Sequence, residues 1–185
     1  HIINQLGVKA GVGYAYEFAG PAISALSMEE RMTICNMSIE GGARCGYINP
    51  DEKTFSYMKD KLCSPQNENW EKAIKWWKSL SSSDNCIYDD VFKLDASKVE
   101  PTITWGITPG QSIGINQQIP SLNEIPPNDQ FIAGEAYEYM GFKPGQSIKN
   151  TPIDVCFIGS CTNGRISDLR AVSYTHLRAH ETPEP

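Results

Sequence analysis

Residues 153–170 read IDVCFIGSCTNGRISDLR, a short apolar run followed by small polar residues and then by a mixed segment. The run 153–158 is rich in β-branched side chains, which is the profile of a buried strand. The small residues at 159–163 are typical of a tight turn, and the residues from Ile166 onward are compatible with a helix. A strand, a turn and a helix in this order predict an α/β architecture.

Cys161 lies in the predicted turn. A turn between a strand and a helix places a cysteine sulfur near backbone N–H groups at the positive end of a helix dipole, which favours the thiolate that attacks carbon or binds iron. Thr162 and Asn163 add side-chain donors suited to an anion or a cluster sulfide. On chemistry alone, a buried structural cysteine among turn-forming residues is the favoured interpretation, and both remain open.

The composition is that of a folded globular protein, with 40% hydrophobic and 21% charged residues among 185. A net charge of −6 disfavours a nucleic-acid partner, and no apolar run approaches the roughly 20 residues that cross a bilayer. The six cysteines match no small disulfide scaffold. We therefore expect reduced thiols and a cytoplasmic protein, with Cys35, Cys45 and Cys156 packed as small hydrophobic side chains.

The rest of the chain alternates helical and strand-like patterns. Ser27 and Glu30 fit a capping box that starts a helix expected to reach about Arg44. Interleaved helices and short strands favour the same α/β class. Further helices are expected at 2–6, 21–26, 51–62, 69–80 and 128–140, strands at 87–94 and 102–105, and an extended loop at 108–127.

Asn36 and Glu40 stand four residues apart in the helix expected after Ser27. This spacing predicts that both side chains lie on one helical face. The neighbouring side chains are mostly apolar, so the helix is expected to be buried, and a buried carboxylate is costly unless it is paired or used. The alternative is that Glu40 pairs with a basic residue elsewhere or lies on a polar surface.

Four segments carry a family resemblance. GSCTNGR at 159–165 resembles the GSCTN signature of the aconitase family, in the form typical of its isopropylmalate dehydratase branch. MTICNMSIE at 32–40 resembles the family's T-x-C-N-M-x-x-E helix. PDEKTF at 50–55 and TWG at 104–106 with PGQ at 109–111 follow in the family's order. Four ordered matches are far more specific than any one of them.

The resemblance covers roughly residues 1–171 and implies an aconitase-like three-layer α/β/α fold, present here only in part. We expect residues 1–105 to form the C-terminal part of one α/β domain. Residues 106–171 are expected to begin the next domain, which carries the GSCTN segment.

The resemblance also implies a 4Fe-4S cluster. In the family, the signature cysteine is the first of three cluster ligands, and the other two lie in a C-x-x-C pair further along the chain. Cys161 is therefore implied as a metal ligand, and Ser160, Thr162 and Asn163 are implied as cofactor-binding residues beside it.

The implied activity is that of a hydro-lyase that isomerises 2-isopropylmalate and 3-isopropylmalate by dehydration and rehydration in leucine biosynthesis. Asn36 is implied to hydrogen-bond near the cluster, and Glu40 to join the proton and water network at the open iron. In this branch the base that removes the carbon-bound proton belongs to a swivelling domain on a separate small subunit. The implied partners are that subunit, as a heterodimer, and a small hydroxy-acid substrate.

Two features depart from the family pattern. The chain starts at His1 without an initiator Met and contains no C-x-x-C pair, so two cluster ligands are missing. Residues 172–185 are polar, match nothing expected there, and resemble a translated sequencing adapter. We therefore expect an internal fragment with a non-native tail that alone holds no stable cluster and is inactive.

Several alternatives remain. Homoaconitase and a methylmalate-type hydratase belong to the same family and differ mainly in substrate. An enzyme that uses Cys161 as a nucleophile would need a histidine base, but the histidines are His1 and two in the suspect tail, His176 and His180. An anion-binding module would cradle a phosphate at 159–163, although the phosphate-loop pattern is absent.

Overall fold

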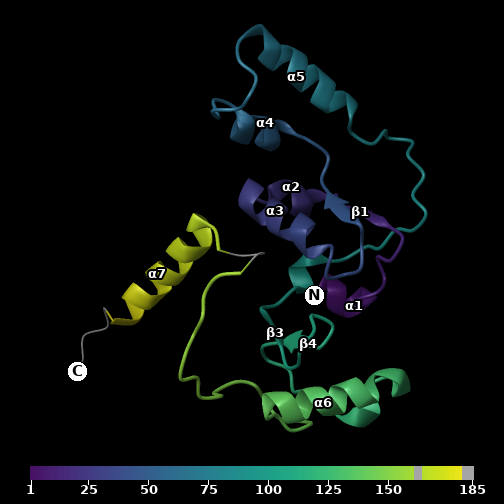
Figure 1. Cartoon of the computed structure of the whole chain (residues 1–185), viewed down its shortest axis with the longest axis vertical. Coiled ribbons are helices and arrows are strands. Elements are labelled where there is room, and N and C mark those ends of the chain that lie inside the picture. Colours follow the sequence, from purple (N-terminus) through teal and green to yellow (C-terminus); the bar gives the residue numbers. More distant parts are fainter. Residues whose placement is uncertain (161–163, 181–185) are drawn as a thin grey trace. The chain divides into compact units, whose positions relative to one another are not determined.

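The computed structural model describes the backbone of residues 1–160 and 164–180 and the side chains of residues 1–160 and 164–174 (Figure 1). The chain divides into two compact units made of interleaved segments. Unit 1 comprises His1–Tyr14, Ile39–Arg44 and Asp90–Val155, and unit 2 comprises Ala15–Ser38, Cys45–Asp89 and the described residues from Cys156 onward.

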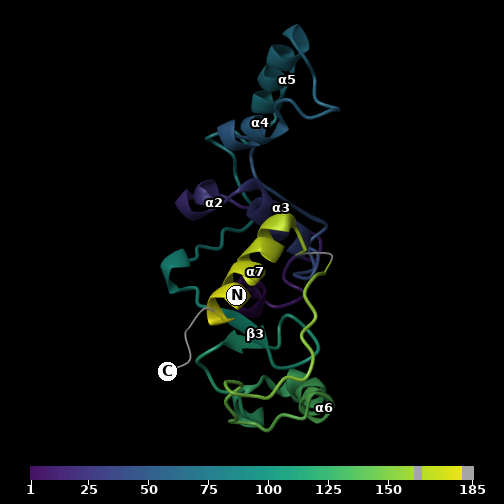
Figure 2. The same cartoon turned by 90° about the vertical axis from the view of Figure 1, so that its left-hand side faces the viewer.

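Unit 1 is built around helix α6 and a small antiparallel sheet, which lie side by side in Figures 1 and 2. The sheet pairs β3 with β4, with Ile103 opposite Ile113. The elements of this unit are α1 (Ile2–Leu6), β3 (Thr102–Thr104), β4 (Ser112–Gly114), α6 (Gln130–Met140) and three short 3-10 helices at Ala96–Lys98, Leu122–Glu124 and Pro127–Asp129.

The core of unit 1 lies between α6 and this sheet. The rings of Trp105 and Tyr137 stack with their centroids 5.0 Å apart, and the Tyr137 hydroxyl donates to the carbonyl of Pro120 at 2.7 Å. Ile119 is almost fully enclosed beside them. Helix α6 ends at Gly141, whose φ of 68° is the left-handed conformation that glycine favours at helix ends. The helix predicted at 128–140 is thus confirmed, with its start at Gln130.

Unit 2 contains a parallel pair of strands and five helices within the described residues. Strand β1 pairs with β2 in the register Ala15 to Cys45. Helix α3 packs on β2 where Gly46 approaches the buried Ser38. The elements are β1 (Ala15–Glu17), α2 (Pro21–Ala25), α3 (Met28–Met37), β2 (Cys45–Tyr47), α4 (Glu52–Met58), α5 (Glu68–Ser79) and α7 (Ile166–His180).

Helix α3 begins as predicted and ends earlier than predicted. Ser27 and Glu30 form the predicted capping box, with the Ser27 N–H donating to the Glu30 carboxylate at 2.7 Å and the Glu30 N–H donating to the Ser27 hydroxyl at 3.3 Å. The helix stops at Met37 instead of continuing to Arg44. Gly42 has a φ of 85°, outside the right-handed helical region, so the turn at 38–42 cannot continue the helix.

Two predicted strands are wrong. Residues 87–94 have no strand partner in the described chain, and Ile87 is 95% exposed. Two consecutive acidic residues, Asp89 and Asp90, interrupt the apolar run. Residues 153–158 also form no strand, and Phe157 is 87% exposed. A β-branched run becomes a strand only where a neighbouring strand satisfies its backbone groups, and among the described residues none lies beside this one.

The observed elements support the predicted α/β class in a coarse form, as helices mixed with two two-stranded sheets. The boundary predicted near Trp105 and the foreign origin proposed for residues 172–185 stay predictions.

Candidate functional site

The GSCTN segment follows the exposed run at 153–158. Gly159 has a φ of 128°, which a residue with a side chain rarely adopts, and Ser160 is exposed. Cys161, Thr162 and Asn163 lie outside the described residues. The ligand role implied for Cys161 therefore remains a prediction.

The chain after this segment enters helix α7 through a carboxylate cap. One oxygen of Asp168 accepts from the backbone N–H of Gly164 at 3.1 Å and of Arg165 at 3.0 Å. This is the half of a capping box in which the third helical residue reaches back to the start of the helix. These two N–H groups are thus already bonded to the chain's own carboxylate. The anion-binding alternative places its phosphate at 159–163, and because part of this segment lies outside the described residues, that alternative stays a prediction.

Asn36 lies in a helix, whereas Glu40 lies in the turn that follows it. Asn36 is exposed in the last turn of α3, whereas Glu40 follows the helix in the turn at 38–42. The prediction that both share one helical face is wrong, because the helix ends between them. Glu40 is half-buried, and its Oε2 atom is buried without a hydrogen-bond partner in the described chain. Such an atom is an unusual feature that calls for a donor from elsewhere.

The described cysteines do not form a ligand set. Burial, with a smaller effect of the nearby Cys45, raises the pKa of the Cys35 thiol, which opposes a thiolate role. Cys45 and Cys156 are exposed, so the expectation that they pack as small hydrophobic side chains is wrong. Within the described ranges, no three His, Cys, Asp or Glu side chains come together in a way that could hold a metal ion.

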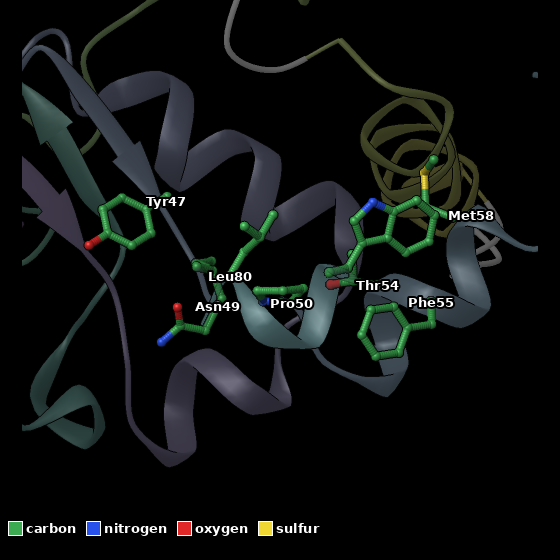
Figure 3. Close-up of a pocket in the computed structure, with 9 residues that line it drawn as sticks. Tyr47, Asn49, Pro50, Thr54, Phe55, Met58 and Leu80 are labelled. Carbon is green, nitrogen blue, oxygen red and sulfur yellow. The ribbon is translucent and has the colours of Figure 1, made fainter. Parts of the chain in front are cut away.

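A cavity of about 430 Å³ lies within unit 2, between the β2–α4 connection and helices α4 and α5 (Figure 3). Its size is in the range of small-ligand sites. Its wall is mostly apolar and includes no carboxylate, lysine, arginine or histidine among the described residues. It is lined by Tyr47, Ile48, Asn49, Pro50, Thr54, Phe55, Met58, Trp77 and Leu80. The cavity was not predicted from the sequence, although Trp70, Ile74 and Trp77 recur at helical spacing, which indicates an apolar face of α5.

The polar side chains at one end of the cavity are bonded to Glu17. The Glu17 carboxylate accepts from Tyr47 at 3.0 Å, Asn49 at 2.8 Å and Ser82 at 2.5 Å, and also from Tyr88. Partial burial raises the pKa of Glu17, but the four hydrogen bonds outweigh this effect and hold the pKa below its ordinary value. We call these five residues the Glu17 network. It ties the irregular segment after α5 to the β1–β2 pair.

A comparison with known protein families places these features in context. The model of the aconitase family (aconitate hydratase) matches residues 1–182. The chain belongs to the aconitase family. The resemblance found in the GSCTN and T-x-C-N-M-x-x-E segments is therefore confirmed at the level of the family.

Within the aconitase family, the chain is most usefully compared with two individual relatives. The chain is 92% identical over 173 residues to the 3-isopropylmalate dehydratase large subunit of Prochlorococcus marinus subsp. pastoris, covering 94% of this chain and 37% of the relative. It is 63% identical over 169 residues to the protein of the same name from Synechocystis sp., covering 91% of this chain and 36% of that relative. The chain thus spans little more than a third of the length of these aconitase-family relatives.

The match of 173 of 185 residues to the first relative reaches both candidate segments, since positions 36, 40 and 161 lie well inside it. The predicted similarity to the isopropylmalate dehydratase branch is confirmed. As for membrane insertion, none of the helices in the described residues of this aconitase-family chain is long and apolar enough to span a bilayer.

Proposed function

We propose that this chain is part of an iron–sulfur hydro-lyase that interconverts 2-isopropylmalate and 3-isopropylmalate by dehydration and rehydration. The observation that carries the proposal is the 92% identity over 173 residues to a protein named 3-isopropylmalate dehydratase large subunit. The whole activity belongs to a longer protein, because the chain spans 37% of that relative.

In this proposal Cys161 supplies one thiolate to a 4Fe-4S cluster, beside Ser160, Thr162 and Asn163. The described cysteines offer no complete ligand set, so the other two ligands would come from the part of the full-length relatives that this chain does not span. When bound, the cluster would supply a Lewis-acidic iron with a free coordination position. Cysteine thiolates are the ligands that iron–sulfur clusters prefer.

The proposed work of this chain's own residues is to hold protons and orient the substrate. The buried, unpartnered Oε2 of Glu40 supports a role in holding a proton or a water molecule, since a buried carboxylate oxygen without a donor is energetically unfavourable. The exposed Asn36 offers an amide that both donates and accepts hydrogen bonds at the end of α3.

The same proposal includes the complete three-layer α/β/α fold, a small subunit that brings the base for the carbon-bound proton, and a cytoplasmic location. The words "large subunit" in the names of the relatives support the partner.

The test uses the full-length large subunit that contains these residues, produced with its small subunit and reconstituted anaerobically with iron and sulfide. Formation of the unsaturated dicarboxylate from 3-isopropylmalate is followed by its ultraviolet absorbance. We expect Cys161→Ser to lose the iron–sulfur absorbance and the activity. Cys156→Ser is the matched control, because it removes an exposed thiol five positions away and should keep both. Equal behaviour of the two variants would refute the ligand assignment.

A second pair of variants tests Glu40. Glu40→Gln should keep the cluster and lower kcat, whereas Glu135→Gln, an exposed position on α6, should change neither. Offering homologous hydroxy acids in the same assay separates isopropylmalate dehydratase from homoaconitase and methylmalate-type hydratases. Iodoacetamide labelling tests the nucleophile alternative: activity without iron that is lost when Cys161 is alkylated would favour it.

A further inference from the structure

Helix α3, which carries Asn36, is held near its start by a buried arginine. Arg31 is 3% exposed and donates through both terminal nitrogens to the Asp51 carboxylate, each at 2.7 Å. One of these nitrogens also donates to the carbonyl of Ser24, in the last turn of α2, at 3.1 Å. Arg31 therefore joins α3 to α2 and to the start of α4.

A second cation, Lys53 of α4, binds at the junction of α2, α3 and α4. The Lys53 ammonium donates to three successive carbonyls at the end of α2, those of Ser24 at 2.9 Å, Ala25 at 2.5 Å and Leu26 at 2.8 Å. Helix ends leave such carbonyls without partners, and a cation there is favourable. All three ammonium protons have acceptors, so the lysine is fixed in place despite its exposure.

We infer that Lys53 and Arg31 are positioning residues that set the position of Asn36 by clamping α3 to α2 and α4. This inference rests on the proposed function, in which Asn36 contacts the reacting site. Arg31 and Asn36 lie five positions apart on one ten-residue helix, about 7.5 Å along its axis. A rotation or slide of α3 at the clamp is transmitted directly to Asn36, because a helix moves as a rigid body over this length.

The two cations, Arg31 and Lys53, hold different pairs of helices together. The ion pair of Arg31 with Asp51 fixes α3 against α4, and the Lys53 contacts fix α2 against α4. The loop between α2 and α3 contains only Leu26 and Ser27. Since α2 and α4 are both fixed by these contacts, the N-terminal end of α3 is held by both of its neighbouring helices.

The experiment compares Lys53→Met with Lys59→Met in the reconstituted full-length enzyme. Lys59 is an exposed lysine at the end of the same helix, so both variants remove one positive charge. We expect Lys53→Met to lower kcat/KM by about tenfold or more at unchanged cluster content per subunit, since misplacement by about 1 Å is that harmful. Lys59→Met should leave kcat/KM unchanged, and equal values for the two variants would overturn the inference.

Chemical rescue with an added amine tests whether Lys53 acts through its N–H donors. Lys53→Ala leaves the three carbonyls without a donor, and ammonium chloride should partly restore kcat/KM. Tetramethylammonium chloride at the same ionic strength should not, because it has no N–H group. Failure of ammonium to restore activity in a folded Lys53→Ala enzyme would show that the three N–H contacts of Lys53 do not position Asn36, and would overturn the inference.

A readout without activity distinguishes this inference from the proposed function. In the reconstituted full-length enzyme, the α3 amides should exchange with deuterium faster in Lys53→Met than in Lys59→Met. A wild-type enzyme that holds its cluster but has no dehydratase activity would refute the proposed function and leave the inference about the clamp untouched. Equal exchange in α3 would overturn the clamp alone.

Discussion

Arg31 and Asp51 form a doubly hydrogen-bonded ion pair in which Asp51 has a second task. Its Oδ1 atom accepts from Arg31 at 2.7 Å and from the backbone N–H of Thr54 at 3.1 Å, so the same carboxylate is the N-cap of α4. The Arg31 side chain is 3% exposed and that of Asp51 is 42% exposed. Removal of the Asp51 carboxylate would leave the buried Arg31 guanidinium without its anionic partner and α4 without its N-cap.

We therefore expect Asp51→Ala to lower the free energy of unfolding by about 2 kcal/mol. The value lies below that for a fully buried pair because solvent screens the exposed side of Asp51. Asp89→Ala, which removes an exposed carboxylate in an irregular segment, should change it by less than about 0.5 kcal/mol. Urea denaturation followed by tryptophan fluorescence measures both, and a change below 0.5 kcal/mol for Asp51→Ala would show that the pair contributes little.

The same ion pair predicts a dependence on pH. The hydrogen bond from Arg31 lowers the pKa of Asp51 from 3.8 to about 2. A carboxylate with a depressed pKa stabilises the folded state above its unfolded pKa and loses that contribution as the pH falls through its folded pKa. Stability should therefore fall between about pH 4 and pH 2, and more steeply in the wild type than in Asp51→Ala. Parallel profiles of denaturation midpoint against pH would contradict the assignment.

Local signals in the sequence predicted the helices well. The capping box at Ser27 and Glu30 and the helical patterns at 69–80 and 128–140 each act within a few residues, and the structure has a helix at each of these places. The end of α3 at Met37 differs from the predicted end near Arg44, because the apolar pattern continues into a turn in which Gly42 has a φ of 85°. Strands depend on distant partners, and the runs at 87–94 and 153–158 lack them in the described chain.

The candidate site was predicted from motifs more than from physical chemistry. Spacing alone suggested a shared helical face for Asn36 and Glu40, which the turn after Met37 rules out. The unpartnered oxygen of Glu40 could not be foreseen, because burial of a turn residue depends on remote segments. Likewise, Lys53 meets α2 across a sequence separation of 27 to 29 residues, which no local pattern reveals.

Gly46 is expected to tolerate no side chain. A Cβ there would lie 2.8 Å from the Cβ of Ser38 and 3.0 Å from the ring of Phe18. Ser38 is buried and bonded to the carbonyl of Ile34, so it has little room to move. Gly46→Ala should therefore lower the free energy of unfolding by about 1–3 kcal/mol.

Gly134 provides the matched control for that substitution. It lies inside α6 with nothing within 4 Å of an added Cβ. Gly134→Ala should raise the free energy of unfolding by about 0.5–1 kcal/mol, because alanine loses less backbone entropy in a helix. Thermal or urea unfolding of both variants tests the pair, and a stabilising Gly46→Ala would mean that α3 does not pack on β2 as described.

Glu17→Gln is expected to loosen the segment that follows α5. The ionised carboxylate accepts four hydrogen bonds, whereas a glutamine offers one oxygen and an NH₂ group that must face the same donors. We expect a loss of about 1–3 kcal/mol in the free energy of unfolding and faster amide exchange around Ser82. Glu71→Gln, an exposed position on α5, should show neither effect.

Tyr88, one of the two tyrosines of the Glu17 network, gives an independent spectroscopic test. The hydrogen bond to Glu17 raises the pKa of Tyr88 from 10.0 to about 12, because the phenolate would face a carboxylate. In Glu17→Gln the phenol no longer donates to a charged carboxylate, so the Tyr88 pKa should move back toward the ordinary value. Alkaline titration of phenolate absorbance, with Tyr88→Phe to identify the signal, measures the shift. A Tyr88 titration that is the same in wild type and Glu17→Gln would show that the phenol does not bond to this carboxylate in solution.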